Sequence, residues 1–111
     1  KKIAIVKSEK AVITDVQSAL DVMATVNYQH DSSRIILDKA SIGEAFFDLK
    51  TNIAGEILQK FVNYCVKIAI IGDFSVYTSK SLRDFIYESN KGANIFFLDN
   101  ETEAIEKLGA Y

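Results

Sequence analysis

The stretch that decides the fold reads Val66-Lys67-Ile68-Ala69-Ile70-Ile71 and is stopped by Gly72-Asp73. Five of its six strand residues are apolar, without the alternation expected of a strand that has one face in water. Such a continuous run is typical of a strand that is covered on both faces of a parallel sheet. This stretch therefore predicts a central strand inside an α/β domain.

Further elements follow from the periodicity on either side of this strand. Short apolar runs predict strands at 3–6, 34–38 and 95–98, and a weaker run at 11–14 is expected to pair back on the first as an antiparallel edge. Apolar residues at helical spacing predict a helix before each later strand and one after the last. The order β-β-α-β-α-β-α-β-α predicts a single domain over 1–111, with a mostly parallel sheet of four to five strands.

Composition and charge exclude several classes of protein. Thirteen basic and 15 acidic side chains give a net charge of −2, and the lysines are scattered among acids, which argues against nucleic-acid binding. Apolar runs stay far below the roughly 18 residues of a membrane helix. One cysteine and one histidine do not make a disulfide or a Cys/His metal site, so we expect a cytoplasmic protein without metal or cofactor.

Two polar loops follow predicted strands and are the candidate binding sites. In open α/β sheets, ligands usually meet the loops at the carboxyl ends of the strands, where helix N-termini also point. The first loop contributes Asp48, Lys50 and Thr51. The second loop and the helix start behind it contribute Asp73, Ser75, Tyr77, Thr78, Ser79, Lys80 and Arg83.

The second loop has two interpretations. Its hydroxyls, free backbone N–H groups and cations suit an anion such as phosphate or carboxylate. The alternative is that Thr78 or Ser79 simply caps the helix while Lys80 and Arg83 are solvated, and we favour this alternative. The chain has neither of the common glycine-rich nucleotide motifs, so a nucleotide site of those kinds is not predicted.

Catalytic groups are sparse, and we assign none. Cys65 is expected to be a small buried apolar group, and His30 to lie at a helix end where the dipole favours it. Asp38 and Asp73 each end a predicted strand and could face one another as acid and base, but a strand-end Asp is equally a turn former. The sequence therefore favours a protein that is not an enzyme.

The aromatic pairs Phe46-Phe47 and Phe96-Phe97 bear on possible partners. Their members are expected on opposite sides of their elements, so one of each pair is exposed unless covering helices bury both. A homodimer through the N-terminal edge strand or an exposed aromatic patch is compatible with the sequence.

Two longer strings resemble the bacterial family called domain of unknown function 4180. They run from Asp48 to Phe61 and from Tyr77 to Gly92, and with 15–24 and 94–98 the likeness covers nearly the whole chain. The family's name implies no activity. A more distant likeness is to STAS domains (sulfate transporter and anti-sigma-factor antagonist), through the Asp-ended strand 35–38 and the turn at 48–51.

The STAS resemblance implies an α/β regulatory module that binds a protein partner. Antagonists of that type are switched by phosphorylation of a serine in the turn, but Leu49 and Lys50 replace the serines here. Thr51 stays as a candidate phosphoacceptor, with helix capping as the alternative.

We therefore expect a non-enzymatic regulatory or protein-binding module that uses the loops at Asp48–Thr51 and Ser75–Arg83. The alternative is a small-molecule site for an anion, or an uncharacterised enzyme, at the helix start Thr78–Arg83. The expected partners are thus a protein or a small anion.

Overall fold

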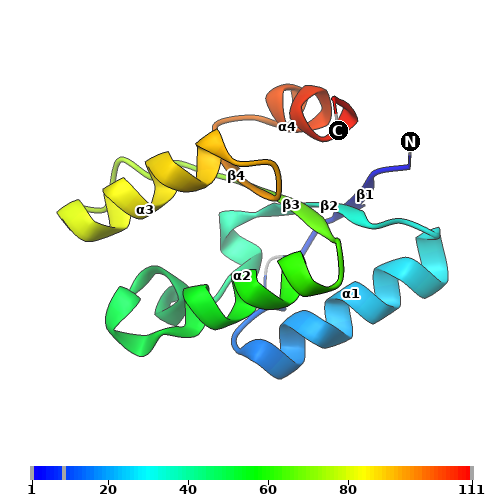
Figure 1. Ribbon diagram of the computed structural model, residues 1–111, viewed down its shortest axis with the longest axis horizontal. Helices are drawn as coiled ribbons and strands as arrows, with labels where there is room; N and C mark the ends of the chain where they lie inside the picture. Colours follow the sequence, from blue (N-terminus) through cyan, green and yellow to red (C-terminus); the bar gives the residue numbers. More distant parts are fainter. Residues whose placement is uncertain (1, 9, 111) are drawn as a thin grey trace.

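The computed structural model describes residues 2–8 and 10–110 as an α/β fold around one parallel sheet (Figure 1). The strands pair in the order β1-β2-β3-β4, and every neighbouring pair is parallel. The strands are β1 (Ala4–Val6), β2 (Arg34–Asp38), β3 (Lys67–Ile71) and β4 (Ile95–Leu98). The predicted fold class is thereby confirmed.

Each strand is followed by a helical connection. The α-helices are α1 (Val16–His30), α2 (Ile53–Asn63), α3 (Lys80–Lys91) and α4 (Glu101–Gly109). The passage from β2 to α2 also contains the short 3-10 helices η1 (Lys39–Ser41), η2 (Glu44–Phe47) and η3 (Leu49–Thr51). Within the described residues, none of the helices has both the length and the apolar character that crossing a membrane requires.

Side chains along each strand point alternately into two cores, one on each face of the sheet. Ile35, Leu37, Ile68 and Ile70 pack with α1, α2 and Leu82 of α3 on the first face. On the second face, a smaller cluster is formed with α4 by Ile36, Ala69, Phe96, Ala104 and Leu108. Figure 1 shows α1 and α2 on one side of the sheet and α4 on the other. The continuous apolar run of β3 is thus explained by burial on both faces.

The predicted antiparallel edge strand at 11–14 is wrong. Within this segment, Ile13 forms an isolated parallel bridge with Ile42, and its backbone N–H donates to the Ser41 carbonyl at 3.1 Å. The Gly43 N–H in turn donates a hydrogen bond of 2.8 Å to the Ile13 carbonyl. The Ile13 side chain is 1 % exposed, so burying it in the core directs this segment to the turn after β2 and away from β1.

The phenylalanines of both aromatic pairs are buried. Phe97 belongs to the core of α1–α3 and Phe96 to the core of α4, so the two do lie on opposite sides of β4. Phe46 and Phe47 pack edge to face, with ring centroids 5.1 Å apart, in the first core. Of the two alternatives, burial of both members of each pair is confirmed, since helices cover both faces of β4 and the first core encloses η2.

Cys65 is exposed, which contradicts its predicted burial. It lies just after α2 in the left-handed conformation, with φ of 57°. Its N–H donates to the Val62 carbonyl at 3.1 Å, while the Val66 N–H donates to the Phe61 carbonyl at 2.8 Å. This bond pair is the Schellman ending of a helix, in which Cys65 takes the place that glycine usually occupies. The reversal of the chain into β3 therefore turns the thiol outward.

Candidate functional site

The two predicted loops meet at the carboxyl edge of the sheet through Tyr77. Its ring stacks on Phe47 of η2, with centroids 5.0 Å apart and planes at 18°. Its hydroxyl donates to the carboxylate of Glu44, 3.2 Å from either oxygen. The loop after β3 is therefore held against the segment that follows β2.

Tyr77 stays protonated over the whole ordinary pH range. Partial burial, together with the charge and the hydrogen bond of Glu44, raises the pKa of Tyr77 to about 12. A phenol with such a high pKa is a hydrogen-bond donor and a poor base. Its role here is thus to hold the two loops together.

Lys39 completes this contact, although the sequence did not point to it. Its ammonium lies 4.6 Å from the centre of the Tyr77 ring and donates to the Asp73 carbonyl at 3.4 Å. A Cβ on Gly72 would lie 2.7 Å from Cβ of Lys39, so the glycine is what admits the lysine stem. The available signal was the position of Lys39, directly after a strand that ends at the carboxyl edge of the sheet, where ligands of open α/β sheets usually bind.

Glu44 was also missed, because Ser41-Ile-Gly-Glu44 has the spacing of a capping box. In the structure Ser41 is 0 % exposed, and its hydroxyl donates to the carbonyl of Ser8 at 2.8 Å. Ser41 thus ties the chain after β1 to the η1 turn. Glu44 is left to bind Tyr77.

Asp73 serves the turn after β3. Its carboxylate accepts bonds from the hydroxyl and the backbone N–H of Ser75, and these bonds lower the pKa of Asp73. Asp38 is exposed at the end of β2, where it pairs in register with Ile71. This favours turn formation over acid–base chemistry for Asp73.

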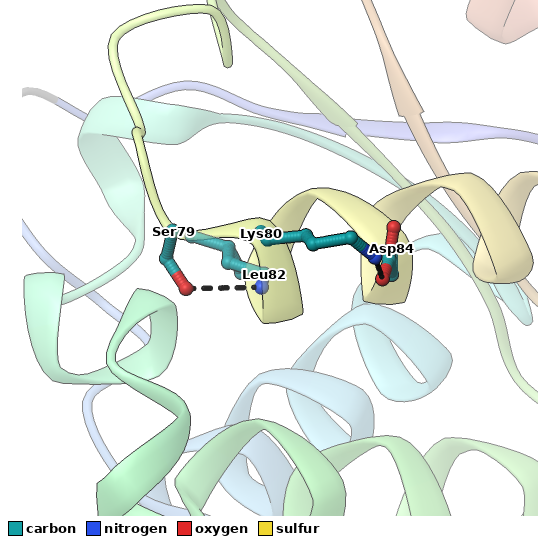
Figure 2. Close-up of polar contacts among 4 residues, drawn as sticks. All are labelled: Ser79, Lys80, Leu82 and Asp84. Atoms are coloured by element: carbon teal, nitrogen blue, oxygen red, sulfur yellow. Dashed lines mark hydrogen bonds and ion pairs between the residues drawn. The ribbon is translucent and has the colours of Figure 1, made fainter.

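The start of α3 is occupied by its own hydrogen bonds (Figure 2). Ser79 caps the helix, because its hydroxyl accepts from the Leu82 N–H at 3.2 Å. The ammonium of Lys80 bonds the Asp84 carboxylate at 2.8 Å, one helical turn away. The predicted capping role is therefore confirmed for Ser79, and Thr78 is exposed beside it.

The first loop is organised in the same manner. The Asp48 carboxylate accepts from the Lys50 N–H at 3.1 Å, which starts η3. The Thr51 hydroxyl donates to the Ala45 carbonyl at 2.8 Å and accepts from the Ile53 N–H at 3.2 Å, at the beginning of α2. Thr51 thus bonds the first N–H of α2 from just before the N-cap, which is Asn52 in the left-handed conformation, and the Lys50 side chain is exposed.

A cleft lies between the first loop and α3. It has a volume of about 390 Å³ and is lined by Leu49, Asn52, Ala54, Gly55, Glu56 and Phe85. A second cleft of about 560 Å³ lies on the α1 side of α2, lined by Val16, Gly55, Glu56, Gln59 and Lys60. Gly55 and Glu56 border both clefts, so the two depressions meet across α2.

Gly55 has no side chain to fill the junction between the two clefts. In the described part of the chain, no atom beyond its helix surroundings lies within 4 Å of the position that a Cβ would take. Neither packing nor a left-handed backbone therefore requires glycine here, since φ of Gly55 is not positive. Sequence reasoning missed this residue because a glycine inside a helical pattern carries no sign of what faces it.

Arg83 lies apart from this cleft. Asn90, seven residues later and hence on the same side of α3, bonds both backbone groups of Phe97 on β4, at 2.7 and 3.1 Å. Phe85 lines the cleft and also packs its ring against Phe97, with centroids 6.2 Å apart. Arg83 is exposed and does not line this cleft, and neither do Asp48, Lys50 and Thr51.

Metal-binding groups are not gathered at the site. Among the described residues, no group of three or more His, Cys, Asp or Glu side chains is placed to hold a metal ion.

Comparison with protein families gives one relation. A family model described as Domain of unknown function (DUF4180) matches residues 1–108, while curated proteins and solved structures gave no match. The likeness to STAS domains stays a prediction. Because the family model spans nearly all of the chain, this chain belongs to the family Domain of unknown function (DUF4180).

Proposed function

We propose that the chain is a non-enzymatic regulatory or protein-binding module, and that its partner contacts the cleft between η3 and α3. The observation that carries the proposal is the open notch at Gly55, where two clefts meet across α2. Glycine in a helix costs about 0.5–1 kcal/mol relative to alanine. Such a cost is explained where another chain approaches the backbone closely.

The walls of this cleft fit a polypeptide. Leu49 and Phe85 offer apolar contacts, and Asn52 and Glu56 offer an amide and a carboxylate beside them. Lys50 is exposed on the same short helix as Leu49 and supplies a positive charge at the rim. An apolar centre with a polar rim is the ordinary composition of a protein interface.

The hydroxyl-rich loops support binding rather than chemistry. Asp73, Thr51 and Ser79 each use their side chains to form a turn or a helix start. Their geometry shapes and stiffens the carboxyl edge of the sheet. The Tyr77 contact to Glu44 then keeps the two loops in a fixed relation, which lowers the entropic cost of binding a partner.

The experiment places a side chain in the open space at Gly55 without disturbing the fold. Gly55→Gln should retain or raise the free energy of unfolding, because glutamine is the better helix former. It should also abolish recovery of the partner in affinity capture from a lysate of the source organism. Gly109→Gln is the matched control, since Gly109 lies in α4 and a Cβ there also meets open space.

The possible outcomes distinguish a wrong choice of binding surface from a wrong choice of function. Loss of the same captured protein in Gly55→Gln and in Lys50→Glu, but not in Gly109→Gln, supports the proposal. Equal capture by all variants contradicts this surface. Absence of any specifically captured protein with the wild-type chain contradicts a protein-binding role.

A further inference from the structure

The outer edge of β4 is covered by a side chain of α3. Among the described strands, β4 lies at one end of the sheet and pairs with β3 alone. Leu98 directs its carbonyl toward β3, where it accepts the Gly72 N–H at 3.0 Å. Backbone groups of successive strand residues point to alternate sides, so Phe97 directs its N–H and its carbonyl away from the sheet.

Asn90 bonds both of these outward groups. Its Oδ1 accepts from the Phe97 N–H at 2.7 Å, and its Nδ2 donates to the Phe97 carbonyl at 3.1 Å. Two residues that lie opposite one another in an antiparallel pair of strands exchange the same two bonds. The carboxamide of Asn90 therefore occupies the place that the backbone of an additional strand would take.

We propose that Asn90 blocks strand addition at the outer edge of β4, so that a second copy of the chain does not extend the sheet there. An edge strand with unpaired N–H and C=O groups is a template for pairing with another chain. All four residues of β4, Ile95–Leu98, are apolar. A strand that pairs with Phe97 would first have to displace the Asn90 side chain.

The two edges of the sheet differ in a way that supports this role. β1 has three residues, and Lys2 and Lys7 lie close to its two ends. Short length and lysine side chains are common protection of an edge strand. Residues 92–98 include neither a charged residue nor a proline, which is the composition of segments that add to other strands. The Asn90 contact thus lies where charge does not protect the edge.

Removal of the Asn90 side chain has two effects that the experiment must separate. It destabilises the fold, because two backbone groups lose their partner, and it uncovers the edge of β4. Asn90→Ala has both effects. Asn90→Asp keeps an acceptor for the Phe97 N–H but brings a carboxylate against the Phe97 carbonyl. It should therefore destabilise the fold, while its charge still prevents strand pairing.

The experiment combines amide hydrogen exchange by NMR with sedimentation velocity of the full chain over a concentration series. Thermal unfolding sets a temperature at which every variant is folded. In dilute Asn90→Ala, the Phe97 amide should exchange about tenfold faster than in the wild-type chain, as expected for one lost hydrogen bond. At higher concentration this amide should regain protection as the variant associates, because β4 of a second copy then bonds it.

The other proteins should behave differently. In the wild-type chain, the Phe97 amide should be protected at every concentration. In Asn90→Asp its exchange should not depend on concentration. Ser89→Ala is the matched control, because the Ser89 hydroxyl donates to the Phe85 carbonyl within α3 at 2.8 Å. Its removal takes away a neighbouring hydrogen bond and leaves the edge of β4 covered.

Each outcome bears on the proposal in one direction. Protection of the Phe97 amide that depends on concentration in Asn90→Ala alone supports it. An unprotected Phe97 amide in the wild-type chain, or equal exchange in dilute Asn90→Ala, overturns it. An Asn90→Ala protein that stays monomeric overturns it as well, because the open edge then attracts no strand. Equal association of Asn90→Asp also overturns it, since lost stability would be the cause. The cleft at Gly55 is tested separately.

Discussion

At the scale of the residue, Tyr77 shows how a side chain from one loop organises another. It was predicted as a candidate binding residue from its place in a polar loop. The structure instead shows it half-buried between Phe47, Glu44 and Lys39. Its contacts come from a segment about thirty residues away in the chain, so its partners were not visible in the local pattern.

The raised pKa of Tyr77 also predicts how the free energy of unfolding depends on pH. Its folded-state pKa is raised from 10.0 to about 12, so its stabilising effect is complete below pH 10 and is lost as the pH rises toward 12. Tyr77→Phe should lower the free energy of unfolding by about 0.5–1.5 kcal/mol at pH 8, because the hydrogen bond to Glu44 is removed. In urea unfolding, the difference between the two proteins should shrink at pH 11. An unchanged difference would contradict the role of the phenol proton.

At the scale of the element, the helix ends are governed by short polar residues and local bonds. Ser79 and Asn100 cap α3 and α4 through their side chains. Asp15 caps α1 in a reciprocal pair with Ser18, whose backbone bond is the largest cause that lowers the pKa of Asp15. These caps were predictable because Ser, Asp and Asn begin helices for a local reason.

The end of α2 gives the element-scale prediction. Cys65 holds the left-handed position of a Schellman motif, and this conformation costs an ordinary L-residue about 1–2 kcal/mol. Cys65→Gly should therefore raise the free energy of unfolding, because glycine adopts the left-handed conformation without strain. The gain is limited to about 1 kcal/mol, because glycine also has more conformational freedom in the unfolded chain. Cys65→Ala serves as the control that removes the thiol and keeps the strain. A glycine variant no more stable than the alanine variant would contradict the argument.

At the scale of the whole molecule, the sheet is covered unequally. Three helices pack on the first face, whereas within the described residues α4 covers the second. Arg34 of β2 donates from its Nε to the Leu108 carbonyl at 3.1 Å, which ties the end of α4 to the sheet. The smaller core therefore depends strongly on each of its few buried side chains.

Leu108 tests this dependence. It is 0 % exposed in the smaller core, and truncation of a buried leucine costs about 2–5 kcal/mol. Leu108→Ala should lower the free energy of unfolding by that amount in urea titration. Ile105→Ala, on the same helix at 43 % exposure, should change it by less than about 1 kcal/mol. Equal losses from the two variants would show that the second face is not a packed core.

The amino-acid sequence by itself determined the α/β class, all four strands to within one residue, and the N-caps of α1, α3 and α4. These features depend on neighbours in the chain: apolar runs, helical spacing and residues that bond their own backbone. The tertiary structure alone decided that 11–14 pairs with the turn after β2, that Phe46 and Phe97 are both buried, and that Gly55 opens onto two clefts. Each of these depends on which distant segment lies opposite, and core packing selects that segment only when the whole chain has folded.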